Sequence, residues 1–309
     1  MRGKLRVPGW PAVVALALAV GFAPLPASRA ETARPYLWKI EGARKPSWIF
    51  GTIHLQRPDV ANPPAPVLAA LKQADAVYTE IPMDSTTILT LLPRMQLPKG
   101  KSLETILGPD LAAELGKELK SIHPSLGLGK VSRLRPWVAA ATLLEIEDQL
   151  KYPSSLPLDL VIFQRAASAG KEVGGLETPD EQLAIFDDLT DAEQAKMIAD
   201  TIAQVRSIRA SGESPSEMLS RLYLDGDLDT LVAKLNEMDA ASSDPALTEK
   251  LMDRLLYRRN VIMAERIVKK LRAHPDKSFF IAVGAAHLPG DRGVLADLER
   301  AGFKLERAP

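Results

Sequence analysis

Two apolar segments near opposite ends of the chain finish in the same pattern, Gly-x-x-His. Residues 47–53 run through Gly51 into His54, and residues 278–283 lead into Gly284 and His287. Each segment has the length and apolar content of a β-strand. Open α/β sheets bind ligands at the carboxyl ends of their strands, and a glycine there lets the backbone turn sharply and approach a bound group. We therefore predict that the two histidines face one crevice if the strands are neighbours.

Further strands are predicted over residues 36–40, which pair with 47–53 as a hairpin, and over 76–81, 172–176 and the last few residues. Helical spacing of apolar residues dominates from about 85 to 276. The predicted fold is α/β, with a mixed central sheet formed by N- and C-terminal strands and a large helical insertion. Residues 31–309 are predicted to form a single domain.

The first 30 residues have the three parts of a secretory signal peptide. Basic residues stand at positions 2, 4 and 6, an apolar stretch follows over 13–22, and Ser28 and Ala30 precede a plausible cleavage point. The apolar stretch is shorter than the ~20 residues of a spanning helix. We expect cleavage, a periplasmic or secreted location, and no stable membrane insertion afterwards.

Composition excludes several classes of site. The chain has no cysteine, so any metal must be held by histidine and carboxylate ligands. It has no basic stripe with interleaved aromatic residues, so nucleic acid is not an expected partner. No Gly-x-Ser-x-Gly or phosphate-loop pattern occurs. The segment 225–229 resembles the start of a calcium loop, but position twelve is Asn236, so a turn between helices is predicted.

A carboxylate is needed beside two imidazoles, because a His–His–Glu set with open positions recurs in zinc and iron sites. Glu80, at the end of strand 76–81, is the predicted third metal ligand, since a carboxylate is costly there unless it is paired or bound to a metal. Glu177 follows strand 172–176 in the same way and is a candidate second ligand or general base. A salt bridge or helix cap remains open for both. His123 and His274 precede prolines in loops and receive no ligand role.

Arg259 and Asn260 interrupt the apolar stripe of a predicted long helix over residues 245–273. Arg259 lies four residues after Leu255 and four before Met263, and Asn260 lies four residues after Leu256. Both polar side chains are therefore expected on the packed face of the helix. A buried arginine needs an anionic partner. Glu80, a substrate carboxylate or a tetrahedral oxyanion would serve, and purely structural pairing stays open.

These motifs together resemble the TraB/PrgY/GumN family, in order from about Leu37 to the C-terminus. The resemblance implies kinship with the TIKI proteins, metal-dependent proteases with paired Gly-x-x-His motifs and a glutamate that are thought to use manganese- or cobalt-type ions. It marks His54, His287 and Glu80 as metal ligands. The matching segments are Leu37–Ile40 as Leu-Trp-Lys-Ile, Phe50-Gly51-Thr52-Ile53-His54, Glu80, Lys171-Glu172-Val173, Leu176-Glu177-Thr178, Arg259-Asn260 and Val283-Gly284-Ala285-Ala286-His287-Leu288-Pro289-Gly290.

We thus predict an exported metal-dependent hydrolase, of peptidase type, with one divalent ion (manganese, cobalt or zinc) and a metal-activated water that attacks a peptide or another small exported substrate. Glu80 or Glu177 would shuttle the proton, and Arg259, with Asn260 beside it, would stabilise the oxyanion. Two alternatives are a non-catalytic periplasmic peptide- or saccharide-binding protein and an accessory protein of polysaccharide biosynthesis.

Overall fold

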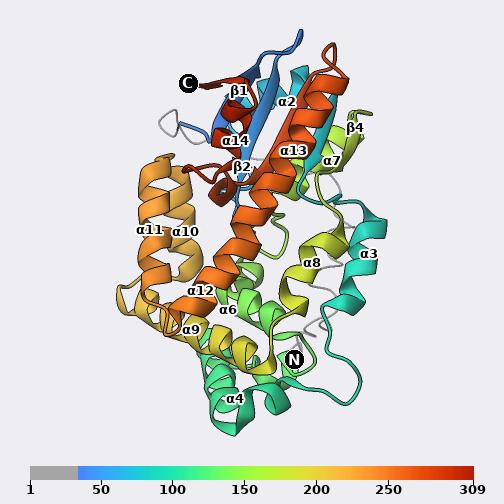
Figure 1. Ribbon diagram of the computed structural model, residues 1–309. Coiled ribbons are helices and arrows are strands. Elements are labelled where there is room, and N and C mark those ends of the chain that lie inside the picture. Colours follow the sequence, from blue (N-terminus) through green and yellow to red (C-terminus); the bar gives the residue numbers. More distant parts are fainter. Residues whose placement is uncertain (1–33) are drawn as a thin grey trace, which may run out of the picture.

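Six strands form one mixed sheet in the computed structural model, which describes residues 34–309 (Figure 1). The predicted signal peptide, residues 1–30, lies outside the described residues. The strand order is β4-β3-β5-β2-β1-β6. Their bounds are β1 Leu37–Glu41, β2 Ser47–Thr52, β3 Ala76–Thr79, β4 Glu172–Gly175, β5 Phe279–Gly284 and β6 Lys304–Arg307.

Four neighbouring strands, β4, β3, β5 and β2, run parallel, whereas β1 is antiparallel to both of its neighbours. All six residues of β2 are buried, as are the first five of β5. Continuous burial of this kind is expected where helices cover both faces of a parallel sheet. The predicted α/β class with a mixed sheet is confirmed, and the N-terminal strand β2 lies directly beside the C-terminal strand β5.

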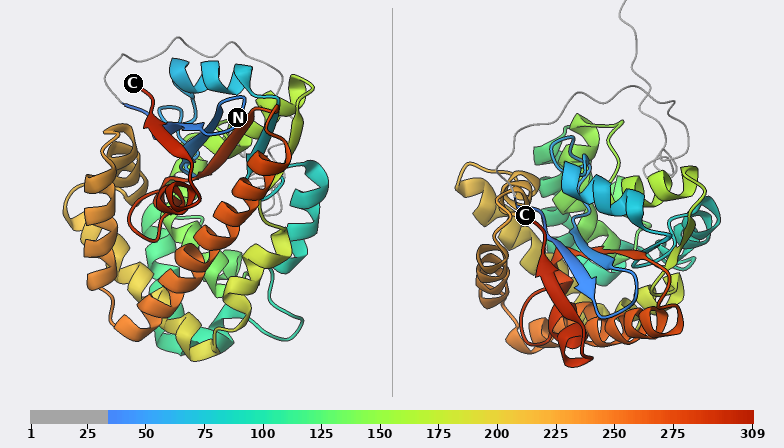
Figure 2. Two further views of the ribbon diagram at one scale, coloured as in Figure 1. Left: turned by 45° about the horizontal axis from the view of Figure 1, so that its top comes forward. Right: turned by 90° about the horizontal axis from the view of Figure 1, so that it is seen from above.

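Helices cover the two faces of the sheet (Figure 2). Ile281 belongs to a core on the face of α13 (Arg258–Ala273) and α14 (Val294–Arg300). Phe280, the preceding residue, belongs to a core on the face of α2 (Ala65–Gln73) and α7 (Leu158–Ser168). The alternation follows from the two-residue period of a strand.

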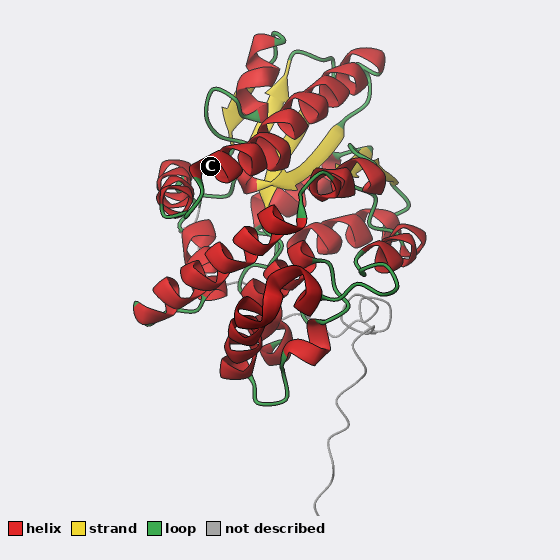
Figure 3. Ribbon diagram, turned by 60° about the horizontal axis from the view of Figure 1, so that its bottom comes forward, coloured by secondary structure: helices red, strands yellow, loops and turns green. Residues whose placement is uncertain are grey.

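The remaining helices form a second layer beyond the sheet, with its own core of α4, α6 and α9 side chains such as Leu115, Leu143 and Ile202 (Figure 3). The chain leaves α10 and enters α11 through Asp225 and Gly226, as the predicted turn between helices requires. The bounds are α3 Ser85–Arg94, α4 Leu103–Ile122, α5 Leu128–Val131, α6 Pro136–Lys151, α8 Pro179–Asp187, α9 Asp191–Ala210, α10 Pro215–Leu224 and α11 Leu228–Ala240.

The predicted long helix over 245–273 is interrupted. It consists of α12 (Pro245–Met252), a π-helical turn (Asp253–Tyr257) and α13. A π turn changes the phase of a helix and is frequent at functional sites. Arg259 and Asn260 lie in the first turn of α13, just after it, and both are buried as predicted.

No helix within residues 34–309 is long and apolar enough to cross a membrane.

Replacing Phe280 by alanine should destabilise the protein by about 3–5 kcal/mol, because its side chain is completely buried between β5 and the helices α2 and α7. Urea unfolding followed by circular dichroism measures the change. Leu89→Ala is the control, since that side chain in α3 is 59% exposed and its loss should cost no more than about 0.5 kcal/mol. Equal effects of the two substitutions would contradict the described core.

Candidate active site

Four predicted site residues follow the carboxyl ends of the four parallel strands. Glu177 follows β4, Glu80 follows β3, His287 follows β5 and His54 follows β2. In the pairing of β2 with β5, Thr52 lies opposite Gly284, so the two Gly-x-x-His motifs stand side by side. The charge of His54 lowers the pKa of both Glu80 and His287, which places the three groups within electrostatic range.

The two motif glycines are needed for close packing. A Cβ at Gly284 would lie 3.1 Å from Glu80 Oε1, and a Cβ at Gly51 would lie 2.8 Å from the Leu288 side chain. Neither glycine has a positive φ. The backbone at these two positions is therefore open to residues other than glycine, and close packing is the reason that glycine is required. The expected close approach is correct for Gly284, but the group it approaches is a carboxylate of the protein itself.

The ring of His287 is held in one tautomer. Asn260 Nδ2 donates to the Arg292 carbonyl at 2.7 Å, which directs Asn260 Oδ1 toward the imidazole. That oxygen is an acceptor 2.6 Å from His287 Nδ1, so Nδ1 carries the proton. His287 Nε2 consequently offers a lone pair to the interior of the site. A fixed Nδ1–H tautomer of this kind is the usual state of a metal-binding histidine.

Burial lowers the pKa of His287 to about 4, and the positive Arg259 acts in the same direction against the opposing charge of Glu80. The imidazole is therefore neutral at pH 7. Its side chain is only 5% exposed. An uncharged imidazole is the form that accepts a hydrogen bond or binds a metal ion through Nε2.

Glu80 is buried and accepts several hydrogen bonds. Its Oε1 accepts from the Gly284 amide at 2.7 Å, and its Oε2 accepts from Arg259 Nη2 at 2.5 Å and from Gln182 Nε2 at 3.0 Å. Burial alone would raise its pKa, but the guanidinium of Arg259, the charge of His54 and the hydrogen bond from the Gly284 amide lower it far below the usual range. Glu80 is therefore ionised.

Arg259 donates all five of its N–H groups to the protein. Nε and Nη2 reach both oxygens of Glu177 at 2.7–3.1 Å, and Nη2 also reaches Glu80. Nη1 donates to the Leu255 carbonyl at 3.0 Å and lies 3.2 Å from His287 Nε2. Glu80, one of the partners considered for Arg259 from the sequence, is thus one of the two carboxylates that it binds.

Glu177 is almost completely buried, with 2% of its side chain exposed. Burial raises its pKa, while the bonds from Arg259 oppose that change. The two carboxylates that share Arg259 therefore have pKa values shifted in opposite directions. Such a difference between adjacent carboxylates is found at sites where one acts as a base or ligand and another holds a proton.

His54 lies near acidic side chains of α7 and α6, whereas His287 contacts side chains of α13. His54 Nδ1 is 3.1 Å from Oδ2 of Asp159, a buried residue in the first turn of α7. Asp159 raises the pKa of His54 to about 10, with smaller contributions from Glu80 and Glu145. Burial raises the pKa of Glu145, on α6, to about 7. Half of the His54 side chain is exposed, so this imidazolium is reached by solvent.

Sequence reasoning missed Asp159, Glu145 and Gln182. Asp159 stands in the apolar run Leu158–Phe163, but an acidic residue in the first turn of a helix is common because it complements the helix dipole. Gln182 and Glu145 lie on helices with no distinguishing local pattern. Only the burial of Asp159 within that apolar run could have indicated a special role.

Imidazole nitrogens and carboxylate oxygens, the kinds of atom that bind divalent cations, are present at the strand ends. His287 presents an unprotonated Nε2, and both carboxylate oxygens of the buried Asp159 lack a hydrogen-bond partner. However, within residues 34–309 no group of three or more His, Asp or Glu side chains stands in a geometry that could hold a metal ion. Instead, the guanidinium of Arg259 supplies the positive charge beside His287 and Glu80.

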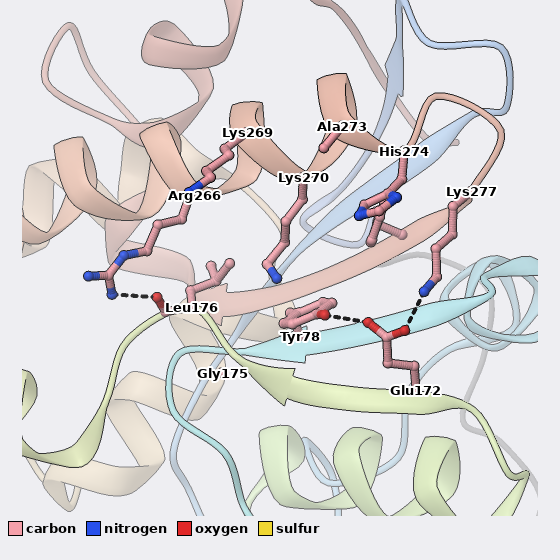
Figure 4. Close-up of a pocket in the computed structure, with 11 residues that line it drawn as sticks. Tyr78, Glu172, Gly175, Leu176, Arg266, Lys269, Lys270, Ala273, His274 and Lys277 are labelled. Atoms are coloured by element: carbon pink, nitrogen blue, oxygen red, sulfur yellow. Dashed lines mark hydrogen bonds and ion pairs between the residues drawn. The ribbon is translucent and has the colours of Figure 1, made fainter.

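A pocket of about 450 Å³ lies elsewhere, between α13 and the strands β3 and β4 (Figure 4). Lys270 Nζ is 3.6 Å from the centre of the Tyr78 ring, and Tyr78 and Lys277 both contact Glu172. None of the site histidines lines it. The pocket is basic and aromatic, and it is separate from the cluster at the strand ends.

The sequence profile of the TraB/PrgY/gumN family matches residues 36–307, which contain all six strands. The chain belongs to this family. The match spans His54, Glu80, Glu177, Arg259 and His287, so the cluster at the strand ends lies entirely within the family region.

Curated relatives in other organisms carry protease names. The chain is 28% identical to "Metalloprotease TIKI1" of Danio rerio over 312 residues, which are 89% of this chain and 63% of that protein. It is 28% identical to "Metalloprotease TIKI1" of Homo sapiens over 313 residues, 89% of this chain and 62% of that protein. The chain thus spans less than two thirds of the length of these relatives.

The match to a bacterial relative covers a larger share of that protein. "Uncharacterized protein YbaP" of Shigella flexneri is 26% identical over 249 residues, which are 79% of this chain and 84% of that protein. No solved structure matches the chain.

At pH 7, in metal-free protein, His287 should be neutral with its proton on Nδ1, and it should stay so on acidification until the pH approaches about 4. Long-range ¹H–¹⁵N correlation spectra report the tautomer and charge of each imidazole, and the four histidines can be assigned with single glutamine variants. Asn260→Ala should release the tautomer. An Nε2–H tautomer in the parent would contradict the described hydrogen bonds.

Arg259→Met should lower the free energy of unfolding by about 3–5 kcal/mol at pH 7, because Glu80 and Glu177 would remain buried without their cation. The difference in unfolding free energy between parent and variant should shrink as the pH falls below about 4.5. The pKa of Glu80 is lowered in the folded parent, so the stability that its ionised carboxylate contributes there is lost progressively on acidification.

Arg266→Met is the matched control. Arg266 lies on the same helix and pairs with Glu181, but both side chains are more than a third exposed, so the expected loss is below about 1 kcal/mol. Urea unfolding at several pH values measures both variants. Equal losses would mean that the buried cluster contributes no more than a surface ion pair.

Proposed function

We propose that this protein is an exported metal-dependent hydrolase of the peptidase type. The observation that carries the proposal is the pair of Gly-x-x-His motifs on the adjacent parallel strands β2 and β5, which puts His54 and His287 at one sheet edge beside buried carboxylates. The TIKI relatives, named metalloproteases, support a metal and a peptide substrate. The leader pattern of residues 1–30 supports export.

His54 and His287 would hold one divalent ion together with a carboxylate. When bound, such an ion supplies Lewis-acid activation of water and of a carbonyl group at neutral pH. The protein prepares for this through Asn260, which holds the His287 ring with its Nε2 lone pair free of a proton. His287 is also uncharged at pH 7, so no proton would have to leave its ring before a metal ion could bind.

Arg259 would act as the cation that positions Glu80 and Glu177. Its five N–H groups already have acceptors, so a substrate oxyanion would have to displace one of them. Glu177 is the proposed proton carrier, since burial raises its pKa toward the working range of a general acid or base. Gln182 would fix Glu80 from the side of α8.

Elemental analysis of mature protein purified without a metal-affinity tag tests the proposal. The parent should contain or take up about one equivalent of manganese, cobalt or zinc, and His54→Ala and His287→Ala should each lose it. His274→Ala is the control, because this histidine lies in a loop and contributes no ligand in the proposal.

Cleavage of a peptide library should require the metal-loaded parent and stop in chelator. Retention of a peptide ligand in chelator, with no cleavage and no metal uptake, would favour the binding-protein alternative instead. Glu177→Gln should lower kcat and leave KM nearly unchanged, because the carboxylate would transfer the proton and not bind the substrate.

A further inference from the structure

The pocket between α13 and the strands β3 and β4 combines an apolar wall with an excess of positive charge (Figure 4). Its volume of about 450 Å³ falls in the range of sites that bind small organic molecules. The buried side chains of Leu176 and Phe279 and the ring of Tyr78 supply the apolar part of the lining. Most of the remaining side chains that line the pocket are basic.

Four cationic side chains within the described residues line the pocket, and two of them already have carboxylate partners. Arg266 pairs with Glu181 on α8 at 2.6 Å. Lys277 pairs with Glu172, the acidic residue of the lining, and that carboxylate also accepts a hydrogen bond from the Tyr78 hydroxyl. The charges of Arg266 and Lys277 are therefore compensated inside the protein.

Lys269 and Lys270 supply the excess charge. Neither forms an ion pair with a carboxylate within residues 34–309. Burial lowers the pKa of Lys270, and its Nζ lies 3.6 Å from the centre of the Tyr78 ring. A partly buried ammonium group normally has an acidic partner, because withdrawal from water disfavours its charge. Lys270 has a ring face in place of such a partner, and a bound anion would supply the missing charge.

The position of Lys270 in the last turn of α13 does not account for its direction. Basic side chains in a last turn commonly complement the helix dipole and bind the terminal carbonyl groups. Lys270 instead extends from the helix across the pocket to the strand β3, where Tyr78 lies (Figure 4). Its ammonium group therefore faces the cavity and not the end of its own helix.

Two lysines favour a phosphate group over a carboxylate. Arginine binds a carboxylate through two parallel hydrogen bonds, whereas lysine binds phosphate as a point charge. Arg266 already makes the two-pronged contact, to both oxygens of Glu181. A phosphate monoester carries a charge of about −1.5 to −2 at pH 7, which matches two unpaired ammonium groups.

We propose that this pocket binds a small phosphate monoester, with the phosphate on Lys269 and Lys270 and an apolar body against Tyr78 and Leu176. The inference goes beyond the proposed hydrolase, because neither of the histidines at the strand ends lines the pocket and no bond is made or broken there.

Calorimetric titration of the mature protein with phenyl phosphate at neutral pH and low salt tests the site. Phenyl phosphate should bind at least about tenfold more tightly than inorganic phosphate, because its ring buries apolar surface in the pocket. It should also bind more tightly than 3-phenylpropionate, a carboxylate with a similar body. Lys270→Met should weaken phenyl phosphate binding about tenfold or more, and Lys270→Arg, which keeps the charge, should recover part of the affinity.

Lys117→Met is the matched control. Lys117 is an exposed lysine on α4, in the helical layer, and its loss changes the net charge by the same amount. Its affinity for phenyl phosphate should stay within about twofold of the parent. A second measurement uses the unaltered chain. In ¹H–¹³C spectra, phenyl phosphate should shift the Tyr78 ring and the Lys270 ε-methylene resonances and leave the Tyr152 ring, which does not line the pocket, in place.

Parent-like binding by Lys270→Met, or equal losses in Lys270→Met and Lys117→Met, would overturn the site. Absence of phenyl phosphate binding, or shifts that spare Tyr78, would do the same. Tighter binding of 3-phenylpropionate would overturn the assignment to phosphate. None of these outcomes bears on the metallohydrolase proposal, which is tested by metal content and peptide cleavage.

Discussion

The buried guanidinium of Arg259 is the contact on which the arrangement of the strand ends depends. It reaches from α13 to Glu177 after β4, to Glu80 after β3 and to His287 after β5, so one side chain joins three neighbouring strands. Two carboxylates buried at this depth would repel each other and lose their hydration without it. Arg259 and Asn260 point inward because they continue the buried stripe of α13, four residues before Met263 and Ala264.

The two matching histidines have opposite electrostatic surroundings. His287 is enclosed on the α13 side by a neutral amide and a cation, and it is uncharged at neutral pH. His54 stands on the α7 side beside Asp159 and Glu145, and it carries a positive charge in the absence of metal. The repeat in the sequence therefore does not produce a symmetric site. It produces one buried, neutral imidazole with a fixed tautomer and one half-exposed imidazolium beside buried acids.

Much of the fold and part of the site follow from local sequence patterns. The strands were predicted to within a residue or two, because each is a short apolar run bounded by turns, and the residues that follow strands, such as Glu80 and Glu177, could be placed at one edge. Asp159, Glu145 and Gln182 could not, because their positions depend on how α6, α7 and α8 pack beyond the sheet.

Strand β5 lies in the interior of the sheet, between β3 and β2, although it is among the last elements along the chain. During synthesis, the N-terminal strands therefore cannot complete the parallel core before residues 279–284 have been made. Pairings between such distant segments form slowly, because a long loop must be ordered first. His287 directly follows the same strand, so the sheet and the polar cluster at its edge are completed together. A chain interrupted before this point would have neither a closed core nor the imidazole that completes the cluster at the strand ends.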